Sequence, residues 1–258
     1  MTIWVDVPIW PAHGRHWCHV ISDESLMELH DFARRAGIPL RSFEGDHYDL
    51  PEERRPEAVA AGARPTTGQD VARRLRDSGL RFPKRRGERP LGRFADGLGW
   101  LGLPHTLDVV ASPHEPATST SAAVVIVSTP ARGEIVLVRS AGRDGWAPPG
   151  GKRDAGESVR EGAVREVAEE TGLRLAPEVL TPVGYERIVV QHGHGTGSWR
   201  DGVNLLAVLA APVAARHAVA PLLDDVLEAR WATRREAERL AGHEPWWALV
   251  DLWWGHHR

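Results

Sequence analysis

Three glutamates in the second half of the chain have the spacing of one helical arc. Glu166, Glu169 and Glu170 stand at positions i, i+3 and i+4, so a helix would place their carboxylates on the same side. Two unit charges ~4 Å apart cost about 4 kcal/mol at an effective dielectric of ~20. A divalent cation would turn that repulsion into affinity, and ligand sets made only of oxygen suit Mg²⁺ or Mn²⁺. On the triplet alone, a solvated helix face is the simpler interpretation, since exposed like-charge pairs cost only about 0.2–0.5 kcal/mol.

The ends of the helix that carries these glutamates are marked in the sequence. Ser158 can cap the first turn and Glu161 completes a capping box, while Gly172 suits the residue after the last helical position. The pattern therefore predicts a helix over 159–171. An apolar stripe at four-residue spacing is assigned to its sheet-facing side: Val159, Ala163 and Val167.

The wider spacing favours metal chemistry over a solvated face. Gly151 is followed after five residues by Glu157, and after seven more by a run of specified positions: Arg165, Glu166, Val167, Glu169, Glu170, Gly172 and Leu173. With these residues the chain fills every fixed position of the Nudix box, and the part from about Ser121 to Trp254 resembles the Nudix hydrolase family. The flanks agree, because 146–151 resembles the family's strand-to-loop entry and 227–231 resembles its late strand.

The resemblance implies metal-dependent hydrolysis of a nucleoside diphosphate linked to another group, with water attacking phosphorus at a diphosphate bound through Mg²⁺ or Mn²⁺. It also implies a set of metal ligands: Glu166, Glu169, Glu170 and the Gly151 carbonyl. Glu157 and Arg165 would orient this set, and Arg165 stands four residues before Glu169, a spacing that permits a forked hydrogen bond. A carboxylate would accept the proton of the attacking water. Glu166 is the first choice for this base and Glu228, on the late strand, is the second.

Residues that contact the substrate are less clearly marked. Trp146 and Tyr185 could stack on a base, although a buried core position is the alternative for both. The loop 192–200, which ends in Arg200, lies between two predicted strands, where it could close over a ligand or be a plain surface loop. We find no downstream residues of the kind that mark the ADP-ribose or coenzyme A subgroups, so the group attached to the nucleoside diphosphate stays open.

Around the box, the sequence predicts a mixed sheet with few helices, which fits a Nudix-like α/β/α sandwich. Apolar runs at 122–127 and 135–138 flank a turn and predict a hairpin. Further strands and helices are predicted along the rest of the chain: strands at 183–190, 203–209 and 227–231, and helices at 234–241 and 245–254.

The first eighty or so residues alternate strand and helix signals, which favours a small parallel α/β domain. The elements predicted there are strands at 3–5 and 40–43, a helix capped by Ser22-Asp23, a helical segment at 52–61 and a helix capped by Thr67. Arginine and proline then gather between Phe82 and Ser121. We therefore expect a small α/β domain over 1–82, a linker over 83–120 and a Nudix hydrolase domain over 121–258.

The N-terminal domain also carries polar residues that could form a second site. Segments 4–15 and 45–49 resemble a small domain family of unassigned function. Asp6 and the pair Asp46-His47 fall at the ends of predicted strands, where open α/β sheets bind ligands. Three neighbouring residues could bind an anion: His13, Gly14 and Arg15. Turns, caps and buried structural roles are the alternative for each of these residues.

Composition limits the remaining possibilities. The 258 residues are 42% hydrophobic and carry a net charge of -3, which describes a globular protein and argues against a nucleic-acid partner. One cysteine excludes an intrachain disulfide and favours a cytoplasmic location, and no apolar run reaches the length of a membrane span. Four tryptophans near the C-terminus fit either core packing or a homodimer contact: Trp246, Trp247, Trp253 and Trp254.

These observations predict a Nudix pyrophosphohydrolase that uses Mg²⁺ or Mn²⁺ to hydrolyse a small nucleotide substrate. A second hypothesis is a nucleotide-sensing regulatory or binding protein with a non-catalytic Nudix fold, because a fold alone does not determine function. The complete set of box glutamates argues against a sensor, which need not keep ligands for catalysis. In a third hypothesis the N-terminal domain is itself an enzyme that acts on a related substrate.

Overall fold

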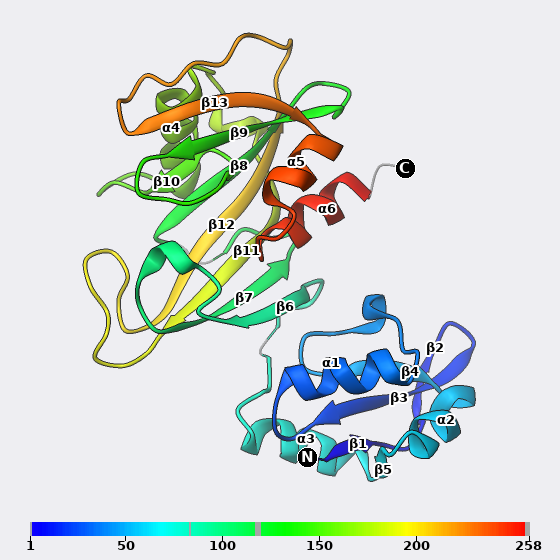
Figure 1. The fold of residues 1–258 in the computed structure, drawn as a ribbon. Helices are drawn as coiled ribbons and strands as arrows, with labels where there is room; N and C mark the ends of the chain where they lie inside the picture. Colours follow the sequence, from blue (N-terminus) through cyan, green and yellow to red (C-terminus); the bar gives the residue numbers. More distant parts are fainter. Residues whose placement is uncertain (1, 83, 117–119, 256–258) are drawn as a thin grey trace. The chain divides into compact units, whose positions relative to one another are not determined.

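The chain forms two compact units, Met1–Leu91 and Gly92–Arg258, in a computed structural model that describes residues 2–82, 84–116 and 120–255 (Figure 1). Each unit has its own sheet and its own hydrophobic clusters, so each is described by itself. The division falls inside the segment predicted as a linker, 83–120. Residues 83 and 117–119 of that segment lie outside the described residues.

The first unit is built on a mixed sheet in the order β2-β3-β1-β5, with β4 paired to β3. Its strands are β1 (Ile3–Val5), β2 (Trp10–Ala12), β3 (Arg15–Ser22), β4 (Tyr48–Pro51) and β5 (Arg64–Pro65). The α/β class agrees with the sequence, but the predicted parallel pairing holds only for β1 with β5 among the described strand pairs. Short turns lead from β1 through β2 to β3, and they produce antiparallel neighbours, whereas a parallel connection needs a crossover of about a dozen residues or more.

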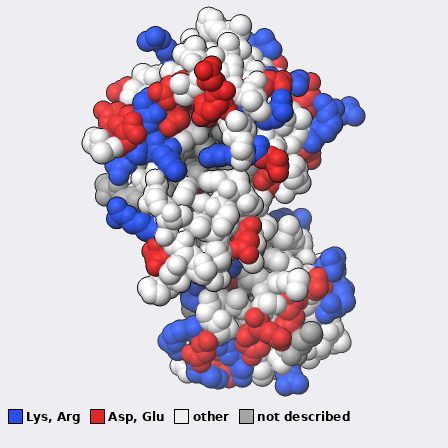
Figure 2. All heavy atoms as spheres, turned by 60° about the vertical axis from the view of Figure 1, so that its left-hand side comes forward, with Lys and Arg blue, Asp and Glu red and all other residues white. Residues whose placement is uncertain are grey.

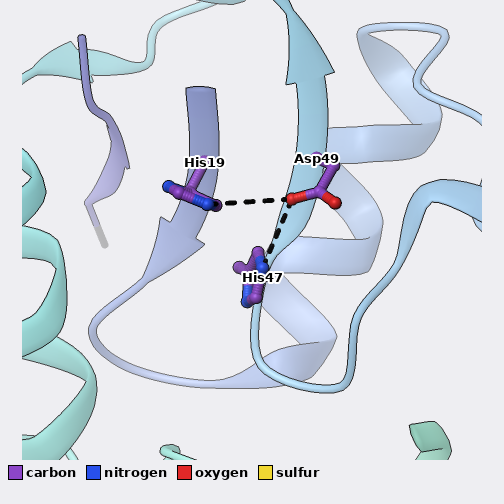
Figure 3. Close-up of side chains that lie close together, drawn as sticks. All are labelled: His19, His47 and Asp49. Atoms are coloured by element: carbon purple, nitrogen blue, oxygen red, sulfur yellow. Dashed lines mark ion pairs between the residues drawn. The ribbon is translucent and has the colours of Figure 1, made fainter. Parts of the chain in front are cut away.

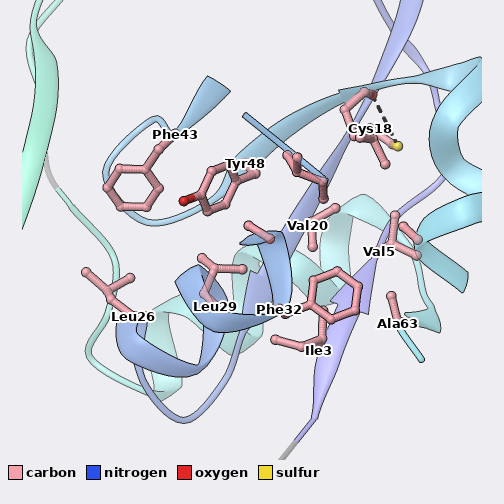
Figure 4. Close-up of a cluster of buried hydrophobic side chains, with 14 residues drawn as sticks. Ile3, Val5, Cys18, Val20, Leu26, Leu29, Phe32, Phe43, Tyr48 and Ala63 are labelled. Atoms are coloured by element: carbon pink, nitrogen blue, oxygen red, sulfur yellow. Dashed lines mark hydrogen bonds between the residues drawn. The ribbon is translucent and has the colours of Figure 1, made fainter. Parts of the chain in front are cut away.

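Helix α1 (Leu26–Arg35) covers one face of this sheet. It begins at Ser25, whose hydroxyl accepts a hydrogen bond from the backbone N–H of Glu28. Its apolar side chains, among them Leu29 and Phe32, pack in one buried cluster with residues of β1, β3 and β4 (Figure 4). This cluster is the larger hydrophobic core of the first unit.

Helix α3 (Gly68–Asp77) covers the opposite face of the same sheet. Its Val71 and Leu75 pack against Ile21 of β3, whereas the preceding residue, Val20, belongs to the cluster beneath α1. Consecutive residues of a strand point to opposite faces, so the sheet separates the two helices.

Shorter elements complete the first unit, and they show that the strand predicted over 40–43 is wrong and that the helical segment over 52–61 is divided in two. The predicted strand over 40–43 contains a 3₁₀ turn, η1 (Leu40–Ser42). Segment 52–61 contains η2 (Glu52–Arg54) and α2 (Arg55–Ala60). The predicted cap at Thr67 is confirmed, since its side chain accepts a hydrogen bond from the backbone of the third residue into α3.

The single cysteine lies in the core beneath α1. Cys18 is fully buried in β3, and its Sγ donates a hydrogen bond to the Leu50 carbonyl 3.3 Å away. Burial, together with the negative charge of Asp6, raises the pKa of the Cys18 thiol to about 12. The thiol therefore stays protonated and unreactive while the first unit is folded.

The second unit is built on an eight-stranded mixed sheet in the order β13-β9-β8-β12-β11-β7-β6, with β10 paired to β8. Its strands are β6 (Arg89–Ala95), β7 (His105–Ala111), β8 (Ala122–Ser128), β9 (Glu134–Ser140), β10 (Gly150–Lys152), β11 (Thr181–Val190), β12 (Gly202–Pro212) and β13 (Val226–Thr233). The predicted hairpin of β8 and β9 is present, and β8 and β12 pair in parallel. Strand β6 begins three residues before the division between the units.

Two of these strands lie where a linker was predicted. Strand β7 pairs with β11 along its whole length, from His105 opposite Val190 to Ala111 opposite Gly184. The segment is rich in glycine and arginine, which hides its apolar alternation, but Leu107, Val109 and Val110 are all fully buried. Residues 89–95 and 105–111 are therefore strands of the second unit's sheet rather than a solvated connection.

Helices cover both faces of this sheet, which gives the predicted three layers (Figure 1). Helix α4 (Val159–Thr171) packs its apolar stripe on alternate side chains of β8, including Val125. Helices α5 (Arg234–Ala241) and α6 (Trp247–Gly255) contact β13, β9, β11 and β7. The intervening Val124 faces a cavity that Val250 of α6 also lines, so α4 and α6 lie on opposite sides of the sheet.

The C-terminal tryptophans pack against one another. Trp247 lies next to Trp246 and Trp254, with ring centroids 6.2 and 6.0 Å apart, and Trp253 lies next to Trp254. Trp247, Trp253 and Trp254 are buried. Core packing therefore accounts for these three residues, and a homodimer stays a prediction.

The described helices and the visible surface can be compared with what a membrane span and a nucleic-acid site need. None of the described helices is long and apolar enough to cross a membrane. Acidic and basic side chains are interspersed on the visible face of each unit (Figure 2). That face therefore carries no broad basic area of the kind that binds a nucleic-acid backbone.

Candidate active site

A bend at two glycines brings the backbone of β10 against helix α4. The Gly150 N–H donates a hydrogen bond of 2.7 Å to the Glu170 carboxylate. The Glu166 carboxylate occupies the space beside Gly151, where an added Cβ would lie 2.5 Å from the glutamate Cδ. A Cβ at position 151 would displace the Glu166 carboxylate, and its absence lets the backbone lie directly beside two of the box carboxylates.

The Arg165 guanidinium joins three of the box carboxylates. Its Nη1 donates to Glu166 Oε1 and to Glu169 Oε2, both at 3.0 Å, and its Nε donates to Glu157 Oε1 at 2.9 Å. Its Nη2 also donates to the Lys152 carbonyl. The contact predicted between Arg165 and Glu169 is thus confirmed. The Arg165 guanidinium fixes the orientation of carboxylates from both ends of the box.

Burial divides the carboxylates into two kinds. Desolvation raises the pKa of Glu170 to about 7, despite the Gly150 hydrogen bond, and it also raises the pKa of Glu166, although Arg165 opposes the shift. The hydrogen bond from Arg165 instead lowers the pKa of the partly exposed Glu157. Glu166 and Glu170 are therefore carboxylates whose negative charge needs further compensation.

This donor set matches a hard divalent cation in its chemistry. Half-buried carboxylates and a nearby backbone carbonyl at Gly151 are oxygen ligands, which Mg²⁺ and Mn²⁺ prefer. In the described part of the chain, the carboxylates of α4 do not form a group of three donor atoms within 4.8 Å of one another. Arg165 and Gly150 hold them instead, so binding a cation would require these side chains to rotate.

A cavity on the α6 side of the sheet begins at this carboxylate set. Glu170 and Gly150 are part of its lining, which also includes several large or charged side chains: Trp100, Arg143, Trp146, Glu244 and Trp246. A second cavity shares Trp100, Arg143 and Trp246 with the first. The two cavities are adjacent because they share these lining residues, and together they are called the recess here; tryptophans line it, and Glu170 and Glu244 line the first cavity.

The second cavity is lined mainly by apolar side chains, with Arg143 and one glutamate as its charged residues. Leu98, Val124, Leu206 and Val208 line it together with Glu186 of β11. Burial, together with the negative charge of Glu244, raises the pKa of Glu186 to about 7, while Arg143 opposes the shift. Its Oε1 is buried and has no hydrogen-bond partner among the described residues.

The predicted substrate contacts divide between this recess and other places. Trp146 lines the recess beside Arg143, and the guanidinium of Arg139 lies 5.9 Å from the Trp146 ring. Tyr185 is buried in β11 and Arg200 is exposed, and neither lines the recess. The site assignments of Tyr185 and Arg200 stay predictions that the geometry does not support.

Glu228, the second choice for the catalytic base, also lies outside the recess lining. It is on β13, with a half-exposed side chain 3.6 Å from the Arg139 guanidinium. Glu166 lies against Gly151 and Arg165 instead. The structure therefore places the first-choice base in the carboxylate set and the second-choice base in an exposed ion pair.

Sequence reasoning missed several side chains of the recess: Trp100, Arg143, Glu186, Glu244 and Trp246. Glu186 gives a signal in retrospect, because a carboxylate interrupts a strand that is otherwise largely apolar. Trp100 gives none, since it lies in a glycine-rich segment whose place in the sheet depends on pairing with distant β11.

The second unit, with its mixed sheet between helical layers and a glutamate-rich helix that follows a glycine bend, has the architecture of a Nudix domain. A family model described as the NUDIX domain matches residues 119–250, about half of the chain. The chain belongs to the Nudix family. A second model, described as a protein of unknown function (DUF4031), matches residues 3–78 in the first unit.

Individual relatives match shorter stretches. The Nudix hydrolase YvcI of Bacillus subtilis is 35% identical over 66 residues, 26% of this chain and 41% of its own length. A second Bacillus subtilis protein, provisionally described as an 8-oxo-dGTP diphosphatase, is 46% identical over 57 residues, 22% of this chain and 38% of its own length. The chain thus spans about two fifths of the curated relatives it matches. A solved Nudix hydrolase from Nitrosomonas europaea is 19% identical with a TM-score of 0.41, covering 54% of this chain and 91% of that one.

Proposed function

We propose that the second unit hydrolyses a phosphoric anhydride bond in a nucleoside diphosphate linked to another group, and that it depends on Mg²⁺ or Mn²⁺. The observation that carries this proposal is the position of Glu170. It is buried, accepts a hydrogen bond from the Gly150 N–H, and lines a cavity whose lining also includes three tryptophans. A carboxylate with a raised pKa at such a place fits a site that receives positive charge.

The cation would be held by residues of the box: Glu166, Glu169, Glu170 and the Gly151 carbonyl. When bound, it would compensate the negative charge of the diphosphate and lower the pKa of a bound water. The chain's own residues orient the reactants. Arg165 fixes Glu166 and Glu169 from one side, while Glu157 fixes Arg165.

Glu166 is the proposed base that accepts the proton of the attacking water. Its side chain is only 16% exposed, and burial raises the pKa of its carboxyl group above the ordinary range. A raised pKa makes a carboxylate a stronger proton acceptor near neutral pH. Arg165 keeps this carboxylate turned toward the bend at Gly151.

The recess is proposed to bind the nucleoside. Trp100 and Trp246 provide aromatic faces on which a base can stack, and Arg143 lies where it can pair with phosphate oxygens. Glu186, whose buried Oε1 has no hydrogen-bond partner among the described residues, would hydrogen-bond to N–H groups of the base. The group attached to the diphosphate and the cytoplasmic location both stay predictions.

Substituting single box glutamates tests the proposal. We expect Glu166→Gln and Glu170→Gln to lower kcat/KM for nucleotide sugars, dinucleotides or nucleoside triphosphates by more than tenfold, or about 1.4 kcal/mol. Glu161→Gln is the matched control, because it makes the same change on an exposed residue of the same helix and keeps a capping box. Equal rates in all four proteins would contradict the metal role. Tight nucleotide binding without turnover in the unsubstituted protein would instead identify a sensor.

A further inference from the structure

Three adjacent strands of the first unit bring polar side chains into one row. Val5 pairs with Val20 and Val20 with Tyr48. The next positions along these strands are Asp6 after β1, His19 in β3 and Asp49 in β4, and the backbone N–H of Asp6 bonds to the His19 carbonyl. His47 stands two residues before Asp49, on the same side of its strand.

Each of the two histidines is held by its own buried aspartate. His19 Nδ1 lies 2.8 Å from Asp6 Oδ2, and His47 Nδ1 lies 2.5 Å from Asp46 Oδ1. Both aspartates are almost completely buried. Asp6 also accepts a hydrogen bond from the His19 backbone, and Asp46 accepts one from the backbone of Phe82, so neither carboxylate can turn away easily.

Because both Nδ1 atoms are occupied, both Nε2 atoms point to a common place. His47 Nε2 lies 3.3 Å and His19 Nε2 lies 3.9 Å from the same atom, Asp49 Oδ1 (Figure 3). The two imidazole rings stand edge to face with centroids 4.9 Å apart. In the described part of the chain, this is the one group of three His, Cys, Asp or Glu side chains with donor atoms all within 4.8 Å of one another.

We propose that His19, His47 and Asp49 bind a divalent transition metal ion such as Zn²⁺ in the first unit. Two imidazole nitrogens and one carboxylate oxygen are a ligand set that zinc accepts. An aspartate on the far nitrogen of each ligating histidine is the arrangement that fixes the imidazole tautomer and increases its basicity. Here both histidines have such a partner, Asp6 and Asp46 respectively.

Three protein ligands leave a coordination position open for water or a ligand. A cavity of about 190 Å³ lies on the α3 side of the sheet, and it is lined by Asp6, His19 and His47 together with Trp10, Leu75 and Arg81. The metal would therefore bind at the wall of a cavity that has both an apolar and a cationic side. Such a place suits a small anionic ligand of the metal more than a purely structural ion.

The alternative account of the same contacts is an ion pair without metal. Burial opposes the charged form of His47, but hydrogen bonds to Asp46 and Asp49 outweigh it and raise the pKa of this imidazole to about 9. A protonated His47 would then simply link two carboxylates. The two accounts differ in whether the unmodified chain takes up a transition metal at this place.

Cobalt binding to the whole chain distinguishes the two accounts. The metal-stripped protein is titrated with Co²⁺ in the presence of excess Mg²⁺. Mg²⁺ competes with Co²⁺ for the oxygen ligands of the second unit, but it binds imidazole nitrogens poorly and leaves the site in the first unit to Co²⁺. Co²⁺ with four or five ligands absorbs visible light more strongly than octahedral Co²⁺, so the band reports the geometry. We expect the unsubstituted protein to bind one more equivalent of Co²⁺ than His47→Gln or Asp49→Asn, with the strong visible band lost in both.

Matched controls come from the same unit and from the other site. His16→Gln changes an exposed histidine three residues before His19 in β3, and Glu170→Gln changes the second unit; both should keep the band. Asp46→Asn should still bind the same number of Co²⁺ ions, but about 10–100-fold more weakly, because Asp46 positions the ligand His47. Asp31→Asn makes the same change on an exposed aspartate of the first unit and should leave the affinity for Co²⁺ unchanged. Far-ultraviolet circular dichroism checks that each variant is folded. A folded unsubstituted protein without the band, or an Asp49→Asn variant with it, would overturn the proposal.

Discussion

Glu186 keeps its proton to an unusually high pH because the fold buries it. In the unfolded chain this carboxyl titrates near its ordinary value of 4.5, whereas in the native state its pKa is raised to about 7. Between these values the native state binds more protons, so the free energy of unfolding falls as the pH rises. At pH 8 the ionised group costs up to about 3 kcal/mol.

Glu186→Gln should remove this pH-dependent cost. We expect the variant to be more stable than the unsubstituted protein at pH 8 and no more stable at pH 4, measured by urea unfolding of the second unit. Glu178→Gln, an exposed residue of the turn η4 (Pro177–Val179), is the control and should change neither value. A stability difference that is equal at both pH values would show that Glu186 does not hold its proton in the native state.

Gly151 is the residue where the absence of a side chain matters most directly for the site. Gly151→Ala would place a Cβ about 2.5 Å from the Glu166 carboxylate, so either the glutamate or the bend must move. We expect kcat/KM to fall at least tenfold with little change in the melting temperature of the second unit. Gly133→Ala, in the turn between β8 and β9, has open space around its Cβ and should keep full activity.

At the scale of elements, β6 and β7 are needed for both the sheet and the recess. Strand β7 covers the edge of β11 over seven paired positions, and the connection from β6 to β7 supplies Leu98 and Trp100. A chain of residues 89–258, which keeps all of β6, should therefore fold and hydrolyse substrate, whereas one of residues 121–258 should aggregate, because the edge of β11 would be unpaired. Activity and size-exclusion profiles of the two chains test this prediction, and a monomeric, active shorter chain would contradict it.

Helix α4 and strand β3 show how much of the fold the sequence could predict. Helix α4 was predicted to the residue because its capping box, apolar stripe and terminal glycine all lie within the helix itself. Strand β3 was not predicted, because its buried Cys18 and Val20 alternate with the partly buried Trp17 and His19, whose surroundings depend on pairing with β1, β2 and β4. The cluster of His19, His47 and Asp49 could not be predicted for the same reason, since strand register brings these residues together.

At the scale of the whole molecule, the two units present different ligand chemistry. The carboxylates of α4 suit a hard cation, whereas the imidazoles of β3 and the segment before β4 suit a softer one. Each set belongs to a unit with its own core. If both proposed sites bind a metal, removal of one ion should therefore leave the ligands of the other in place.

The buried Cys18 gives this two-unit chain its own reporter group. The thiol lies in the core of the first unit, and the second unit has no cysteine. Iodoacetamide should consequently label the protein only when the first unit opens, while unfolding of the second unit leaves the labelling rate unchanged. A single mass-spectrometric time course can thus follow one unit's opening without dissecting the chain or attaching a dye.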